Sequence, residues 1–161
     1  MDIKKSTRHS KITGTFGEAL LLYWLSKHGF ECASVDHTGI DLIARNPHTN
    51  DLMGISVKSR SRMPGTEKSY IGVPNTNFPK VQQACDAFGC IPYFAFVADA
   101  PTVIRVFVLS MSHLLHLFPC GKRVCTWKMS EKDVSNYYQD SAIMIFELHT
   151  KTHNWWTPNV A

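Results

Sequence analysis

The sequence has no apolar run of about 18 residues, the length that a membrane-spanning helix needs. Its basic first residues are not followed by an apolar stretch that ends in small residues, so a secretory signal is not expected. The five cysteines are odd in number and scattered, which is not typical of a secreted domain with paired cysteines. We therefore expect a cytoplasmic protein with reduced thiols and no membrane association.

The sequence also lacks internal repeats, low-complexity segments and the glycine-rich loops that hold phosphates or dinucleotides. Hydrophobic residues make up 44% and charged residues 19% of the chain, which is ordinary for a globular protein and excludes extensive disorder. A length of 161 residues is typical of a single domain, which we assign to residues 1–161.

Acidic residues are few: 13 Asp and Glu stand against 17 Lys and Arg, a net charge of +4. The basic residues gather in two stretches, Lys4, Lys5, Arg8 and Lys11 in the first and Lys58, Arg60, Arg62 and Lys68 in the second. Such clusters are typical of proteins that bind phosphate backbones, because each cation releases condensed counterions. A solvated loop and a frayed terminus would give the same pattern. We expect Lys11, Arg60, Arg62 and Lys68 to contact phosphates.

Hydrophobic periodicity and turn residues predict the order of the elements. A first helix is expected to begin between Thr13 and Thr15, whose hydroxyls can cap it, and to end at Lys27; further helices are expected at 78–88 and 112–118. Strands are expected at 30–35, 40–45, 52–59, 92–98 and 102–109, weaker ones at 123–128 and 143–149, and a long functional loop at 60–77. This order predicts an α/β fold with a mixed central β-sheet flanked by helices.

The second and third strands are expected to form a hairpin, and its register follows from its turn. A turn centred between His48 and Thr49 pairs residues whose numbers sum to 97, so Asp41 lies opposite Ser56. Side chains alternate along a strand, so Ser56 and Lys58 share the face of Asp41. Asp41, Ser56 and Lys58 are therefore expected to converge.

Glu18 lies among the leucines of the first helix, on the stripe that should face the sheet. A carboxylate there needs a cation or a metal ion nearby, because burial of an unpaired charge is costly. Alternatively, Glu18 is a first-turn acid that complements the helix dipole. Carboxylates around a lysine suit metal-assisted phosphodiester hydrolysis, although Lys58 could also be an ordinary surface lysine at a strand end.

The motifs GEALLLYWLSKHGFE with Glu18, GIDLIAR with Asp41, GISVKSR with Lys58 and the following QQACDAFGCIPYFAFVAD resemble the PD-(D/E)XK nuclease superfamily, most closely its archaeal Holliday junction resolvase-like branch. The resemblance covers residues 12–118 and leaves 119–161 as a C-terminal extension. It implies a restriction-endonuclease-like core, a metal site at Glu18, Asp41 and Lys58, and metal-dependent cleavage of DNA, including branched or junction DNA.

We expect Asp41 and the main-chain carbonyl of Val57 to bind Mg²⁺ or Mn²⁺, with Glu18 holding the water shell of the ion and Lys58 positioning the nucleophile. Cleavage of both strands of DNA would favour a symmetric homodimer.

The sequence departs from the superfamily pattern at Ser56, where a second acid is expected, because a neutral hydroxyl is a weaker metal ligand. Glu67 is a candidate to supply the acid from the long loop, and Gln82 or Gln83 could approach from the second helix. The alternative function is a catalytically inactive protein of this fold that binds nucleic acid or a partner.

Two other groups of residues carry weaker hypotheses. His113, His116, Cys120 and Cys125 could bind a structural zinc ion, although their spacing is unusual and the leucines around them indicate packing. Tyr137, Tyr138, Trp155 and Trp156 could stack on unpaired bases or, more commonly, cover the core.

Overall fold

The computed structural model describes residues 4–153. In chain order its elements are α1 (His9–Lys27), β1 (Glu31–His37), β2 (Ile40–Arg45), β3 (Leu52–Ser61), β4 (Ile71–Pro74), α2 (Asn77–Phe88), β5 (Ile91–Asp99), β6 (Val103–Ser110), α3 (Met111–Leu117), β7 (Val124–Trp127), α4 (Glu131–Tyr138) and β8 (Met144–His149). Among these residues, no helix is both long and apolar enough to cross a membrane.

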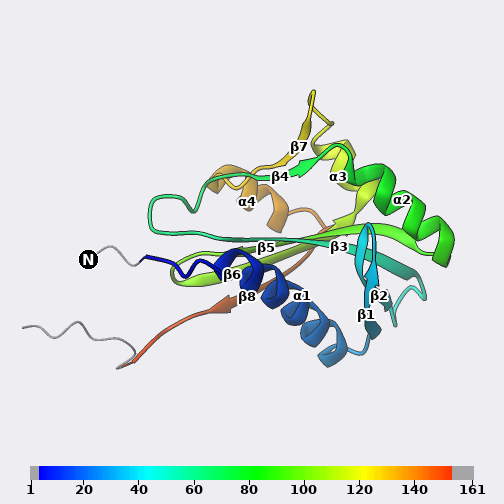
Figure 1. Cartoon of the computed structure of the whole chain (residues 1–161), viewed down its shortest axis with the longest axis horizontal. Helices are drawn as coiled ribbons and strands as arrows, with labels where there is room; N and C mark the ends of the chain where they lie inside the picture. Colours follow the sequence, from blue (N-terminus) through cyan, green and yellow to red (C-terminus); the bar gives the residue numbers. More distant parts are fainter. Residues whose placement is uncertain (1–3, 154–161) are drawn as a thin grey trace, which may run out of the picture.

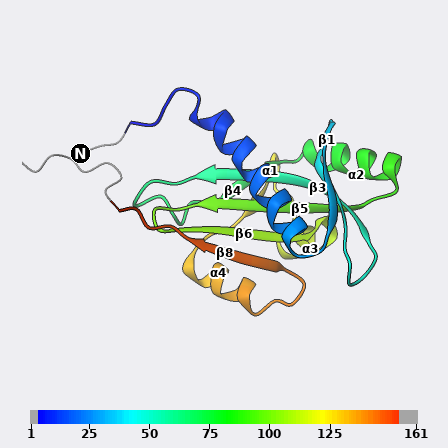
Figure 2. The same cartoon turned by 90° about the horizontal axis from the view of Figure 1, so that it is seen from below.

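A six-stranded sheet in the order β1-β2-β3-β5-β6-β8 divides the protein into two layers. Strands β3 and β5 pair in parallel, and the other neighbours in this sheet are antiparallel. Helix α1 crosses one face, and the remaining helices cover the other face together with the separate β4–β7 pair (Figure 1, Figure 2). The predicted α/β fold with a mixed central sheet flanked by helices is confirmed.

Each face of the sheet has its own hydrophobic core. The core under α1 contains Leu21 and Leu25 and aliphatic residues of the central strands. The opposite core is aromatic, with the Trp127 ring stacked between Phe96 and Tyr137 at centroid distances of 4.6 and 4.1 Å. Tyr137 is therefore a core residue, as the more common interpretation predicted, and Trp155 and Trp156 lie outside the described residues.

Helix α1 begins at His9, several residues before the predicted start. Thr13 and Thr15 do not cap it, because their hydroxyls donate instead to the main-chain carbonyls of His9 and Lys11, one turn earlier. Hydroxyls of Ser and Thr commonly form such bonds within helices, so these threonines lie in the first half of the helix and not at its start. The predicted end at Lys27 is confirmed.

The prediction of a long loop at 60–77 is wrong in part, because β3 continues to Ser61 and residues 71–74 form strand β4. Strand β4 pairs with β7, about fifty residues further along the chain, and a four-residue strand is too short to show a clear period. Helix α4, capped by the hydroxyl of Ser130, was also missed in the polar stretch between the last two predicted strands.

The turn between β1 and β2 packs directly against α2 at Gly39. A Cβ atom at this position would lie 2.6 Å from the carbonyl carbon of Lys80, and the φ angle of Gly39 is +104°. Both the contact and the backbone conformation therefore require glycine. This close approach fixes the start of β2 relative to the first turn of α2.

We predict that Gly39→Ala destabilises the protein more than Gly65→Ala. Gly65 has a comparable φ of +90°, but open space surrounds the position of its missing Cβ. Backbone strain costs about 1 to 3 kcal/mol in each variant, and overpacking against Lys80 adds about 1 to 3 kcal/mol in Gly39→Ala alone. Urea unfolding measures the difference, and equal losses would contradict the close approach.

Candidate functional site

The β2–β3 hairpin ends in a fork that holds the carboxylate of Asp41. The four paired positions all sum to 97, from Arg45–Leu52 to Leu42–Ile55, so the predicted register is confirmed over them. The ladder stops at Leu42–Ile55. Two residues beyond Ile55, the main-chain N–H of Val57 donates to Asp41 Oδ2 at 2.7 Å. The side chain of Asp41 thus takes the place of a strand partner.

A cleft of about 250 Å³ opens beside this fork, on the side of α2. The cleft brings together Asp41, Ser56, Val57 and Lys58 of the hairpin with Asn77 and Lys80 of α2. The side chain of Ser56 is buried, with 3% of the residue exposed.

Sequence reasoning missed Asn77 and Lys80 as cleft residues. Lys80 lies on the exposed face of a predicted helix, and an exposed lysine gives no sign of a cleft. The sequence pattern predicts that Asn77 is the last residue of the long loop.

Glu18 approaches Asp41 from the opposite side of the sheet, on α1. The helix passes so close to β3 that a Cβ atom at Gly17 would lie 2.9 Å from the Cβ of Ser59. Glu18 is half-buried, and its pKa is raised, first by burial and then by the charge of Asp41. Because α1 begins at His9, Glu18 is not in the first turn, and the alternative that it complements the helix dipole is wrong.

The electrostatics of Asp41 and Lys58 follow from burial and from each other. Burial raises the pKa of Asp41, while the Val57 N–H and the charge of Lys58 act in the opposite direction. Burial lowers the pKa of Lys58; Asp41 opposes this effect, and the charges of Arg60 and Lys80 add to it. Without an additional ligand, the charged forms of Glu18, Asp41 and Lys58 are thus disfavoured in the folded protein.

A divalent cation fits these groups chemically. Mg²⁺ is commonly held by one or two carboxylates with water and phosphate oxygens, and a cation beside Glu18 and Asp41 would offset their mutual repulsion. In an antiparallel ladder the N–H and C=O of one residue face the same neighbour, so the Val57 carbonyl is also directed toward the fork. Within residues 4–153, no three His, Cys, Asp or Glu side chains form a metal-binding group, so the acids of the fork are a pair.

The structure places Glu67 and the two glutamines outside the cleft. The Glu67 carboxylate accepts a hydrogen bond from the N–H of Gly65 at 2.7 Å and borders a different hollow, next to α4. Gln82 donates to Asp86, and Gln83 borders a neighbouring hollow. None of the three occupies the position of the acid that Ser56 replaces.

The basic residues predicted to contact phosphates are separated in space. Arg60 borders a large hollow next to the cleft. Arg62 donates to main-chain carbonyls of its own loop, and Lys68 forms an exposed ion pair with Glu131 at 2.9 Å. Lys11 does not border this hollow and lies beside the exposed Ile12 and Phe16 of α1.

Two residues of the zinc hypothesis, His113 and Cys125, have other partners, while the side chains of Cys120 and Cys125 lie next to each other. His113 pairs with Asp140 at 2.7 Å, which lowers the pKa of that carboxyl. The thiol of Cys125 donates to the carbonyl of Phe118 at 3.0 Å, and burial raises its pKa to about 11. A zinc-bound cysteine must be deprotonated, so this environment does not favour zinc.

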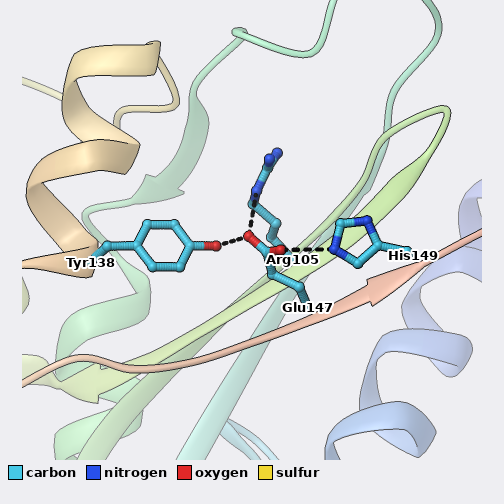
Figure 3. A network of polar contacts seen from close by, with 4 residues as sticks. All are labelled: Arg105, Tyr138, Glu147 and His149. Carbon is cyan, nitrogen blue, oxygen red and sulfur yellow. Dashed lines mark hydrogen bonds and ion pairs between the residues drawn. The ribbon is translucent and has the colours of Figure 1, made fainter.

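A polar network joins β8, the last strand at one edge of the sheet, to its neighbours β6 and α4. Figure 3 shows Glu147 accepting hydrogen bonds from Arg105 of β6 and from Tyr138 of α4, with His149 beside its second oxygen. The hydroxyl of Tyr138 is thus engaged in attaching α4 to β8.

One solved structure with this fold is the Holliday junction resolvase Hjc of Archaeoglobus fulgidus, with a TM-score of 0.53 and 19% sequence identity over 76% of this chain and 88% of that chain. No protein-family model matches the sequence, and no curated protein matches it. At this identity the similarity shows the fold. The predicted restriction-endonuclease-like fold is therefore confirmed.

We predict that Mg²⁺ stabilises the wild-type protein against thermal unfolding and stabilises Glu18→Gln and Asp41→Asn much less. A ligand at ten times its dissociation constant contributes about 1.4 kcal/mol to stability. Differential scanning calorimetry with and without Mg²⁺ measures the shift. Glu67→Gln is the control and should keep the full shift, since Glu67 lies outside the cleft; loss of the shift in this variant would contradict the assignment.

We predict a pH-dependent gain of stability in Glu18→Gln in metal-free buffer. The pKa of Glu18 in the folded protein is above its ordinary value of 4.5. Ionisation of Glu18 therefore reduces wild-type stability as pH rises from the pKa of the unfolded chain to that of the folded protein. The variant lacks this penalty and should be the more stable protein at pH 7, with no such advantage below pH 4.5. Urea unfolding across this range tests the sign.

Proposed function

We propose that the protein is a Mg²⁺- or Mn²⁺-dependent endonuclease that hydrolyses phosphodiester bonds of DNA. The observation that carries the proposal is the position of the Asp41 carboxylate, which acts electrostatically on both Glu18 and Lys58 from the fork of one hairpin. The shared fold with a Holliday junction resolvase supports nuclease chemistry, and it makes branched DNA the first substrate to test.

Each residue of the fork has a role in this proposal. Glu18, Asp41 and the Val57 carbonyl would hold the divalent ion, which supplies charge neutralisation of the phosphate and a bound water of lowered pKa. The Val57 N–H keeps the Asp41 carboxylate in one orientation. Lys58, whose pKa is lowered by burial, donates to a phosphate oxygen and positions the attacking water.

Ser56 favours the second candidate function, a protein of this fold that binds nucleic acid or a partner without cleavage. A site with two carboxylates has less negative charge than one with three and binds Mg²⁺ more weakly. Weak binding is compatible with catalysis, because Mg²⁺ sites often rely on substrate phosphates for further ligands. For cleavage of both strands we propose a homodimer, which would supply two symmetric sites.

We predict that the wild-type protein cleaves junction or duplex DNA in the presence of Mg²⁺ or Mn²⁺ and that Lys58→Ala reduces the rate by about a hundredfold or more. Gel assays on linear, supercoiled and four-way-junction DNA measure the rates. Lys132→Ala, an exposed lysine of α4, is the matched control and should cleave like the wild type.

Ser56→Asp separates the two candidate functions in the same assay. A carboxylate added to Glu18 and Asp41 at the fork should lower the Mg²⁺ concentration for half-maximal cleavage by about tenfold, because affinity depends on ligand charge. Equal rates for wild type and Lys58→Ala would reject the assigned chemistry. Absence of cleavage by both wild type and Ser56→Asp, with DNA binding intact, would establish the binding function instead.

A further inference from the structure

A hollow of about 720 Å³ lies where the segment before α1 meets the outer half of β3. Its described walls contain three basic side chains, Lys5, Lys58 and Arg60, together with His9 and six serine or threonine side chains. No Asp or Glu is among the residues that border it. This composition suits an anion better than a metal ion.

The hollow adjoins the cleft at Asp41, because Val57, Lys58 and Asn77 border both. Lys58 and Arg60 are two residues apart on β3, so their Cα atoms are separated by about 6.6 Å along one face of the strand. We refer to the two adjoining spaces as one groove, with the carboxylate of Asp41 at one end and the basic side chains of Lys5 and Arg60 at the other. A continuous chain with repeated negative charges fits such a groove better than a small anion.

Two polar atoms of the groove residues have no partner in the described part of the chain. His9 Nε2 and Ser59 Oγ are buried and make no hydrogen bond there. Buried polar atoms in proteins are nearly always hydrogen-bonded, so His9 Nε2 is a candidate to bond an atom of a ligand, whereas Ser59 Oγ is packed against Gly17 in the contact between α1 and β3.

The wall formed by the N-terminal segment is held in place by Lys5. Its ammonium donates to the main-chain carbonyl of Ser61 at 3.0 Å and to the Ser61 hydroxyl at 3.1 Å. A lysine ammonium has three donors, so one remains for a ligand. The guanidinium of Arg60 donates to the Ser59 carbonyl at 2.7 Å and likewise keeps further donors.

We propose that this groove binds the phosphate adjacent to the scissile phosphodiester of a DNA strand, with Lys5, His9 and Arg60 as its donors. The proposal rests on the proposed function for the position of the scissile group. It assigns phosphate binding to the segment before α1 and to the first turn of that helix, and it leaves Arg62 and Lys68 outside the groove.

The test is DNA binding in metal-free buffer, where the strand is not cleaved, measured by fluorescence anisotropy over a range of salt concentrations. The double variant Lys5→Ala and Arg60→Ala should bind roughly tenfold more weakly, and the slope of log K against log salt should fall by about one, since the groove holds one phosphate and each phosphate contact contributes about 0.9. The matched control, Lys122→Ala with Lys132→Ala, removes two exposed charges elsewhere and should keep the wild-type slope.

Arg60→Ala alone keeps the test informative if loss of Lys5 loosens the N-terminal segment, and it should lower the slope by about one at most. His9→Phe keeps a ring of similar shape and removes the donor, so DNA binding should weaken while the melting temperature is retained. A wild-type salt slope in both Arg60→Ala and the double variant would overturn the proposal.

A second experiment distinguishes a phosphate of a DNA strand from free inorganic phosphate. The protein is titrated with each of them in turn, and the side-chain resonances of His9 are followed by NMR. Shifts induced by DNA but not by millimolar inorganic phosphate support strand binding. Saturation by inorganic phosphate without any effect of DNA identifies a free-anion site and overturns the proposal.

Failure of the proposed function is recognised separately. Wild-type protein that does not cleave DNA, combined with a reduced salt slope in the variants, rejects the nuclease chemistry and supports the groove. Wild-type cleavage with unchanged DNA binding in the variants rejects the groove and leaves the nuclease proposal intact.

Discussion

The hydrogen bond from the Val57 N–H to Asp41 is the constraint on which the candidate site depends. It ends the β2–β3 ladder and places a carboxylate between the two strands, where both faces of the sheet have access to it. Glu18 can therefore approach from α1 and Lys58 from the side of α2, although these residues belong to different layers. A continuous ladder would have separated them.

Close backbone packing brings the helices to this fork. At Gly17 helix α1 contacts β3 near Ser59, and at Gly39 the turn before β2 contacts the backbone of α2. Both contacts exclude a Cβ atom, so the distance between helix and strand is set by the absence of a side chain. The carboxylate of Glu18 and the ammonium of Lys80 consequently lie near the same two strands.

Charge is distributed along the resulting groove with a clear polarity. The acidic pair at the fork disfavours its own ionisation, and the hydroxyl-rich hollow beyond Lys58 has cations and no bordering acid among the described residues. The acids nearest to these cations are Asp41, which acts electrostatically on Lys58, and Asp99, which accepts a hydrogen bond from the Ser61 hydroxyl that Lys5 also contacts. At the acidic end, Ser56 is a buried neutral residue.

The sequence by itself determined the register of the hairpin, because a short symmetric turn and the alternation of side chains are local properties that place Asp41, Ser56 and Lys58 together. The α/β order followed from the same periodicities. Tertiary structure decided the rest: β4 exists because a strand fifty residues away pairs with it, Glu67 is held at a local turn away from the cleft, and Lys80 and His9 join the site through packing. Such contacts between distant segments leave no period or spacing in the sequence, since they depend on how the whole chain packs.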